Sequence, residues 1–144
     1  MNRVLTVAFA LALSAVGAST AMAADLTITV KEVRNTAGSV RISVFDSAAA
    51  FTKPALAKAR QQAKASEGEV KFVLHDLPAG KYAIASFHDE NNSGKLEFGP
   101  LGVPIQGYGF SNDALGTDGP PAFAQAAFDF DGKNDQAISF SLNY

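Results

Sequence analysis

Hydrophobic and polar residues alternate in several short segments of the chain, which is the pattern of half-buried β-strands. A link containing Asn35 and Gly38 joins the first two segments and predicts a β-hairpin. Segment 82–88 is apolar on both sides, as in a central strand that is covered on both faces. The other alternating segments are 26–30, 40–44, 70–74 and 138–142. Short strands separated by turn residues predict an all-β fold, a single antiparallel β-sandwich over residues 24–144.

Two segments depart from this alternation and favour short helices. In 54–64, Pro54 suits a first helical turn, and Leu56, Ala59 and Ala63 would share one face. We therefore expect a short surface helix between two strands. Segment 122–128, AFAQAAF, follows two prolines and predicts a short helical turn with a buried side.

The first 23 residues have the features of a secretory signal peptide. Arg3 provides a positive start, 4–16 is almost wholly apolar, and Ala21-Met22-Ala23 is a cleavage site of the A-x-A type. The apolar run is shorter than the roughly 20 residues that span a bilayer. Cleavage before Ala24 removes 23 of the 144 residues and leaves 121. The sequence thus predicts an exported protein, periplasmic or secreted, without a membrane span.

Composition narrows the classes of function. The chain has no cysteine, so it has neither disulfides nor a thiol nucleophile. Its formal charge is −2, and loss of the one basic residue in the signal makes it −3. This balance disfavours a nucleic-acid partner, which would need a basic surface. We expect instead a protein or saccharide partner.

The segment 89–97, DENNSGKLE, has oxygen side chains on alternate residues and a glycine at its sixth position. That spacing is typical of loops that wrap Ca²⁺, where glycine allows the sharp turn and a backbone carbonyl binds at the seventh position. Neutral third and fifth positions, and Pro100 at the twelfth, imply weak affinity, on the order of 10⁻⁴ to 10⁻³ M. The predicted calcium ligands are Asp89, Asn91, Ser93, the Lys95 carbonyl and Glu97.

Two alternatives to calcium remain for this loop. Asn, Ser and Gly are also favoured in turns that hold no metal. A small hydrolase would use His88 with Asp89 or Glu97. However, a histidine at a strand end is more commonly held by a structural hydrogen bond than used as a general base. The sequence favours a non-catalytic binding or structural role over hydrolysis.

The second candidate site is the segment 107–112, GYGFSN. Its glycines would either expose Tyr108 and Phe110 to a ligand or let the two rings fill the core. Exposed rings beside Asn112 would form a carbohydrate- or peptide-binding surface. The core-filling interpretation is the one that the sequence favours.

Four motifs in this order resemble an uncharacterised family of small exported bacterial proteins, domain-of-unknown-function family 2141. They are Leu77-Pro78-Ala79-Gly80-x-Tyr82-Ala83, His88-Asp89-x-Asn91-x-x-Gly94-Lys95-Leu96, Gly102-x-Pro104-x-x-Gly107-Tyr108-Gly109-Phe110-Ser111-Asn112 and Pro121-x-Phe123. The first motif is also similar to prealbumin-like β-sandwich modules of bacterial surface proteins, which often carry a Ca²⁺-binding acidic loop. The resemblance implies a prealbumin-like or immunoglobulin-like sandwich and export, but it implies no activity.

Overall fold

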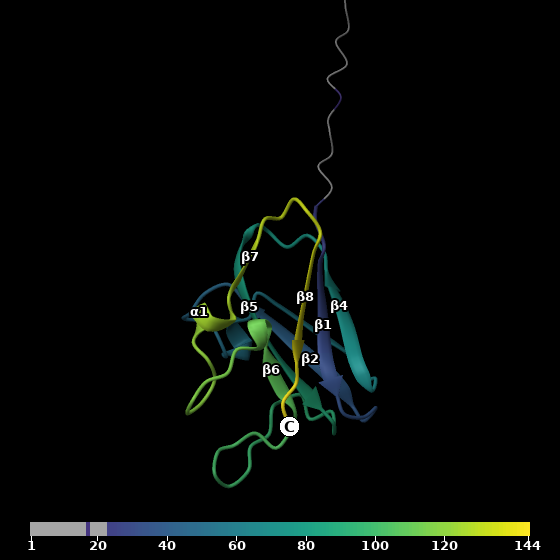
Figure 1. Ribbon diagram of the computed structural model, residues 1–144, viewed down its shortest axis with the longest axis vertical. Helices are drawn as coiled ribbons and strands as arrows, with labels where there is room; N and C mark the ends of the chain where they lie inside the picture. The colour runs from purple at the N-terminus through teal and green to yellow at the C-terminus, as the bar shows by residue number, and fades with distance from the viewer. Residues whose placement is uncertain (1–16, 18–22) are drawn as a thin grey trace, which may run out of the picture.

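The computed structural model describes Gly17 and residues 23–144, and the strands form two sheets with an apolar core between them (Figure 1). This arrangement confirms the predicted all-β sandwich. The predicted signal peptide, residues 1–23, lies outside the described residues apart from Gly17 and Ala23. No helix among the described residues is long and apolar enough to cross a membrane.

The smaller sheet has three strands in the order β4-β1-β8. Strand β1 (Leu26–Val33) pairs antiparallel with β4 (Gly68–Leu74) and parallel with β8 (Gln136–Ser141). The chain thus begins and ends in the same sheet, and its last strand lies beside its first (Figure 1).

The larger sheet has five strands and follows the order β3-β2-β5-β6. Its first three strands are β3 (Ala59–Lys64), β2 (Ser39–Phe45) and β5 (Gly80–Asp89). The far edge of β5 pairs with two short strands, β7 (Phe128–Phe130) at its start and β6 (Tyr108–Phe110) further along. Strand β5 is therefore central, as its two apolar faces predicted. The hairpin predicted for the first two strands is wrong, because β1 and β2 do not pair and lie in different sheets.

The core between the sheets is built from the alternating residues of the predicted strands. Leu26 and Ile28 of β1 face Ile42 of β2 and Ile84 of β5, and each is at most 1% exposed. A second apolar cluster lies on the opposite, outer face of the larger sheet. Its largest members are Phe45, Phe51 and Phe110, with Phe123 packed against them in edge-to-face contacts. The outer face is thus only partly available to solvent.

The helix expected over 54–64 is wrong for most of its length. Only Pro54–Leu56 is helical, as a single 3₁₀ turn (η1), and residues 59–64 form β3 along the edge of β2. Ala59 and Ala63 are four residues apart, which places them on one face of a helix and equally on one face of a strand. Both alanines pack against the core from β3. The spacing fits a helix and a strand equally, and pairing with β2 favours the strand.

Two short helical segments complete the chain. Helix α1 (Phe123–Ala126) is the helical turn predicted within 122–128, and Ala126 is its buried residue. A 3₁₀ turn, η2 (Ser111–Asp113), follows β6 directly. The Ser111 hydroxyl donates to the carbonyl of Ala126 and accepts from the N–H of Ile84, so this turn connects α1 to β5.

Candidate functional site

A groove of about 1200 Å³ lies over the outer face of the larger sheet. Strands β2, β3, β5 and β6 form its floor. Residues 94–104 form one wall, and residues 116–120, together with Thr52 and Pro54, complete the lining. This volume is somewhat larger than that of typical small-molecule sites, which measure about 300–1,000 Å³.

The floor consists of the side chains that point away from the core. Because side chains alternate along a strand, burial of Ile42 and Ile84 turns Arg41, Ser43 and Phe87 to the outer face. Tyr108 and Phe110 extend this face on β6 and stand edge to face, with ring centroids 6.2 Å apart. The groove is therefore built on regular strands, whose positions are set by the core on the other side of the sheet.

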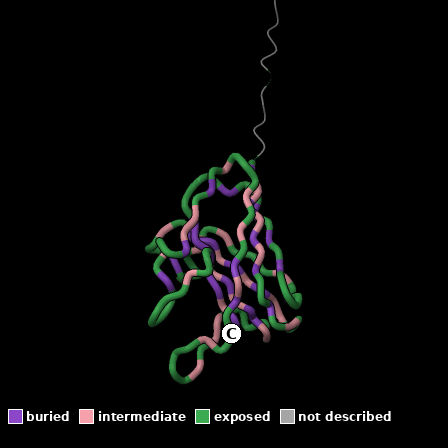
Figure 2. The backbone as a smooth tube through the Cα atoms, in the orientation of Figure 1, coloured by how far each residue is buried: buried purple, intermediate pink, exposed green. Residues whose placement is uncertain are grey.

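One wall is a short hairpin that extends beyond the sheets between β5 and β6 (Figure 1). Phe98 bridges to Pro104, and the N–H of Gly99 donates to the carbonyl of Val103 at 2.8 Å. Leu101 at the tip is 91% exposed, and Figure 2 shows most of this loop in the exposed colour. Phe98, Val103 and Ile105 are also more than half exposed. Backbone hydrogen bonds thus hold an apolar surface out of the sandwich.

The structure separates the three residues of the second predicted site. Tyr108 is half-buried and Phe110 is 9% exposed, and both line the groove. Phe110 also packs on Phe51, with ring centroids 5.9 Å apart. Asn112 does not line the groove, because its side-chain amide donates to the carbonyls of Gln125 and Ala127. Phe110 therefore fills the second apolar cluster, whereas Tyr108 is the more accessible ring.

Asp89 organises the acidic loop from a fully buried position at the end of β5. One carboxylate oxygen, Oδ1, accepts from the N–H of Ser93 at 2.9 Å and from the Ser93 hydroxyl at 3.3 Å. The other, Oδ2, accepts from the N–H of Gly94 at 2.8 Å and from Nε of Arg41 at 2.6 Å. Four donors thus hold one carboxylate and close the turn over 89–94.

The other predicted calcium ligands lie in the same hydrogen-bonded cluster. The Ser93 hydroxyl lies 3.0 Å from the Lys95 carbonyl, which shares the single hydroxyl proton with Asp89, and the Asn91 amide donates to Glu97 at 3.0 Å. Within the described residues, no group of three or more His, Cys, Asp or Glu side chains is placed to hold a metal ion. The loop is closed by its own donors together with the Arg41 cation, and calcium binding remains a prediction.

Two carboxyl groups at this end of the sandwich have pKa values below their ordinary range. Burial alone would raise the pKa of Asp89, but the N–H of Gly94, the Arg41 guanidinium and the N–H of Ser93 outweigh it and lower that pKa. Burial likewise opposes the lowered pKa of Glu90, which accepts hydrogen bonds from Asn35 and Arg34. Both groups are therefore held as carboxylates.

His88 is fully buried between the sheets, as the structural interpretation of this residue predicted. Its Nε2 is 2.7 Å from the carbonyl of Ala37, and its Nδ1 is 2.7 Å from the hydroxyl of Tyr144. A carbonyl only accepts, so in the neutral ring Nε2 donates and Nδ1 accepts from Tyr144. The imidazole bonds neither Asp89 nor Glu97 and does not line the groove. Its two hydrogen bonds fix the end of β5 to residues 37 and 144.

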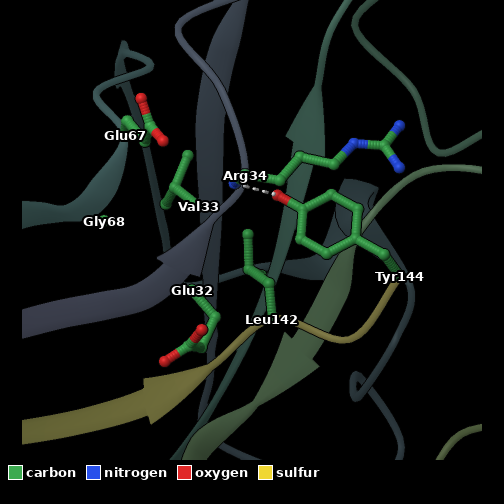
Figure 3. A pocket seen from close by; sticks show the side chains of 7 residues that line it. All are labelled: Glu32, Val33, Arg34, Glu67, Gly68, Leu142 and Tyr144. Atoms are coloured by element: carbon green, nitrogen blue, oxygen red, sulfur yellow. Dashed lines mark hydrogen bonds between the residues drawn. The ribbon is translucent and has the colours of Figure 1, made fainter.

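Tyr144, the last residue, closes this end of the molecule. Its hydroxyl accepts from the N–H of Arg34 at 3.1 Å, and the Arg34 guanidinium lies 4.5 Å from the centre of its ring. Figure 3 shows this contact beside a smaller hollow of about 450 Å³, also lined by Glu32 and Glu67. Burial raises the pKa of Tyr144. Arg34 and Tyr144, which both line this hollow, thus hold residue 144 against the segment that follows β1.

Sequence reasoning missed the polar part of the groove and its apolar wall. Arg60 and Gln62 line the groove from β3, which the sequence analysis assigned to a helix. Arg41 lies in the predicted strand 40–44, and the alternation of that strand predicts that its side chain points outward. Nothing in the sequence indicates that this side chain lines a groove. The apolar residues around Leu101 were a usable signal, because contiguous exposed apolar patches often mark ligand-binding grooves or interaction sites.

The fold and the groove together define an all-β sandwich protein with one large surface site. The chain belongs to the bacterial family described as "uncharacterized protein conserved in bacteria (DUF2141)", which matches residues 28–138. Comparison with curated proteins gives no match, and neither does comparison with solved structures. The matched residues run from β1 into β8, so they include both sheets and the groove. The family resemblance seen in the sequence is thereby confirmed.

Proposed function

We propose that this protein is an exported, non-catalytic binding module and that the groove on the larger sheet is its ligand site. The observation that carries the proposal is the groove itself, whose floor presents Phe87 and Tyr108 between two loop walls. Largely preformed concave sites of this kind are the usual places for small-molecule binding.

The same geometry argues against the alternative of a small hydrolase. A general base must reach the proton that it takes, within about 3.2 Å or through one water. His88 is 0% exposed, and both of its ring nitrogens already have partners. Asp89 is likewise 0% exposed and holds the acidic loop. Neither residue lines the groove.

A neutral fluorescent probe tests the proposal directly. N-phenyl-1-naphthylamine brightens when it leaves water for an apolar site, so we expect the purified protein to enhance its emission saturably. Phe87→Asp, on the groove floor, should abolish the enhancement. Val73→Asp, on the solvent-facing side of β4 in the other sheet, should leave it unchanged.

Phe87 is half-buried, so a thermal melt checks that the Phe87→Asp variant still folds. Leu101→Asp is the second variant, because a side chain that is 91% exposed contributes little to folding. It lines the groove from the wall and should weaken probe binding several-fold. Full enhancement in both variants, or none in the wild type, contradicts the proposed site.

Weak calcium binding by the loop 89–97 is a second candidate function. It is supported by the convergence of the five predicted ligands into one hydrogen-bonded cluster. Because Gly94, Lys95 and Leu96 line the groove, an ion bound in this loop would stiffen one of its walls. The titration that tests it is described in the Discussion.

A further inference from the structure

The groove floor changes in character from one side to the other. Strand register places outward residues in rows that cross the sheet from β3 to β6. One row is Gln62, Arg41, Phe87 and Tyr108, and the next is Arg60, Ser43, Ala85 and Phe110. In both rows the residues on β3 and β2 are polar or cationic, whereas those on β5 and β6 are apolar or aromatic. The floor is thus divided lengthwise into two halves.

The lining of the groove as a whole has a surplus of positive charge. Three cationic side chains line the groove, Arg41, Arg60 and Lys95, against one carboxylate, Asp118. Arg41 is paired with Asp89, but Arg60 and Lys95 form no ion pair within residues 23–144. An anionic group on β2 and β3 would therefore meet Arg60, a cation that no carboxylate within residues 23–144 neutralises.

The aromatic half has little hydrogen-bonding capacity. Its side chains are Ala85, Phe87, Phe110 and Tyr108, of which only Tyr108 carries a polar atom. A sugar would bring several hydroxyl groups onto this surface and leave most of them without partners, which is costly. A hydrocarbon body buries apolar area there at no such cost.

Resting on the proposed function, we propose that the ligand is a monomeric amphipathic anion. Its apolar chain or ring lies on β5 and β6, under the apolar wall of Phe98 and Val103. Its carboxylate or comparable anionic head lies toward Arg60 on β3. The walls on two sides enclose a single chain, whereas a flat membrane surface would not fit between them.

Basic residues on an edge strand also have a role that needs no ligand. Charged side chains there prevent pairing with the edge of another sheet. That role accounts for Arg60. It does not account for the aromatic half of the floor beside Arg60, or for the apolar wall of Phe98 and Val103 over that half. Charge and apolar area lie next to each other on one floor, which is the arrangement that an amphipathic anion complements.

The test compares three ligands with the same ten-carbon chain, with the two ionic ligands kept below their micelle concentrations and the alcohol below its solubility limit. Decanoate, decanol and decyltrimethylammonium are titrated into the purified protein and followed by heteronuclear NMR. We expect shifts confined to groove residues of β2, β3, β5 and β6, with decanoate bound at least about tenfold more tightly than the other two. Arg60→Gln should lower decanoate affinity by about tenfold and leave decanol affinity unchanged. Lys71→Gln on β4 is the matched control and should change neither.

The outcomes separate this inference from the proposed function. Equal affinity for decanoate and decanol, with both in the groove, overturns the charge assignment while the binding site stands. No groove shifts with any of the three ligands overturns both. Co-sedimentation with phosphatidylglycerol vesicles, combined with no shifts from monomeric decanoate, overturns the proposal and assigns the exposed apolar tip to a lipid surface instead.

Discussion

Arg41 and Asp89 lie on neighbouring strands, and Nε of Arg41 donates to Oδ2 of Asp89 at 2.6 Å. The carboxylate is fully buried, whereas the Arg41 side chain is 26% exposed and also lines the groove. The pair therefore joins the acidic loop to the floor of the proposed binding site.

Removing the carboxylate should cost more stability than removing the cation. Asp89→Ala leaves the N–H groups of Ser93 and Gly94 without their acceptor, in addition to breaking the ion pair. Breaking a buried pair typically costs roughly 3–5 kcal/mol, and we expect Asp89→Ala to lose about 3 kcal/mol. Arg41→Gln should lose about half as much, because Gln can still donate and the loop N–H groups keep Asp89. Urea unfolding measures both.

The exposed pair of Lys81 and Asp129 provides the control for this comparison. Their atoms are 3.0 Å apart, but the side chains are 57% and 83% exposed. Exposed pairs of this kind contribute little, so Asp129→Ala should change the free energy of unfolding by less than about 0.5 kcal/mol. If Asp129→Ala lost more free energy of unfolding than Asp89→Ala, burial would not be the reason why the Arg41–Asp89 pair stabilises the fold.

The lowered pKa values of Asp89 and Glu90 predict acid sensitivity. In the unfolded chain these groups have ordinary pKa values of about 4, so the unfolded state binds protons that the native state does not. Their stabilisation is full above about pH 5 and is lost as the pH falls toward the native pKa values. Urea unfolding between pH 7 and pH 3 should show stability falling with pH.

Two variants identify the groups responsible for that acid sensitivity. Asp89→Asn removes one of the titrating groups and should flatten the decline below pH 5, although it lowers stability at pH 7. Asp129→Asn, whose side chain is 83% exposed, should keep the wild-type slope. Parallel pH profiles for wild type and Asp89→Asn would rule out this carboxyl as the source.

The hydrogen bonds of the Tyr144 hydroxyl should stabilise the fold more than a typical hydrogen bond on the surface does. It bonds Nδ1 of the fully buried His88 and accepts from the N–H of Arg34. Tyr144→Phe leaves the buried nitrogen without a partner, which typically costs about 1–3 kcal/mol. Thermal or urea unfolding should show a loss in that range. No measurable loss would mean that water replaces the hydroxyl.

A glycine beside Tyr144 offers an independent check of the same packing. A Cβ atom on Gly107 would overlap the Tyr144 ring, so Gly107→Ala should cost about 1–3 kcal/mol through overpacking. In a Tyr144→Ala background, the same substitution should cost less than about 0.5 kcal/mol. A double-mutant cycle in urea measures this coupling. Additive losses would contradict the contact.

The strands were predictable because one sheet face packs on the core, so that the buried residues recur with period two. Residues 59–64 were not, since Ala59 and Ala63 fit one face of a helix and of a strand equally. The groove was also beyond sequence reasoning. Arg41 meets Phe87 only through the register of β2 with β5, and no local pattern reports which distant side chains share a row.

The acidic loop was recognised from spacing, but its partner was not. Arg41 and Asp89 are 48 residues apart, and their contact depends on both side chains pointing to the outer face of the sheet. Likewise, the burial of His88 depends on the last residue, Tyr144, returning to that end of the sandwich. These contacts are tertiary, so no pattern local to the loop or to His88 reports them.

Calcium binding at the loop 89–97 has a sharper test now that the contacts of Asp89 are known. Ca²⁺ needs oxygen lone pairs of Asp89, and Arg41 occupies one of them as a competing cation. We therefore expect weak binding, with Kd on the order of 10⁻⁴ to 10⁻³ M. At ten times Kd, such binding stabilises the native state by about 1.4 kcal/mol, which raises Tm by several degrees. Melts in chelator and in millimolar Ca²⁺ measure this shift.

Substitution of the competing cation should separate an ion-binding loop from a closed structural turn. Arg41→Gln removes the positive charge that opposes a cation at Oδ2, so its shift with Ca²⁺ should exceed that of the wild type. Asp89→Ala should show no shift, and Mg²⁺ should have much less effect because it demands a tighter octahedral arrangement. Superimposable melts with and without Ca²⁺, in both wild type and Arg41→Gln, would establish that the loop closes by its own hydrogen bonds and holds no ion.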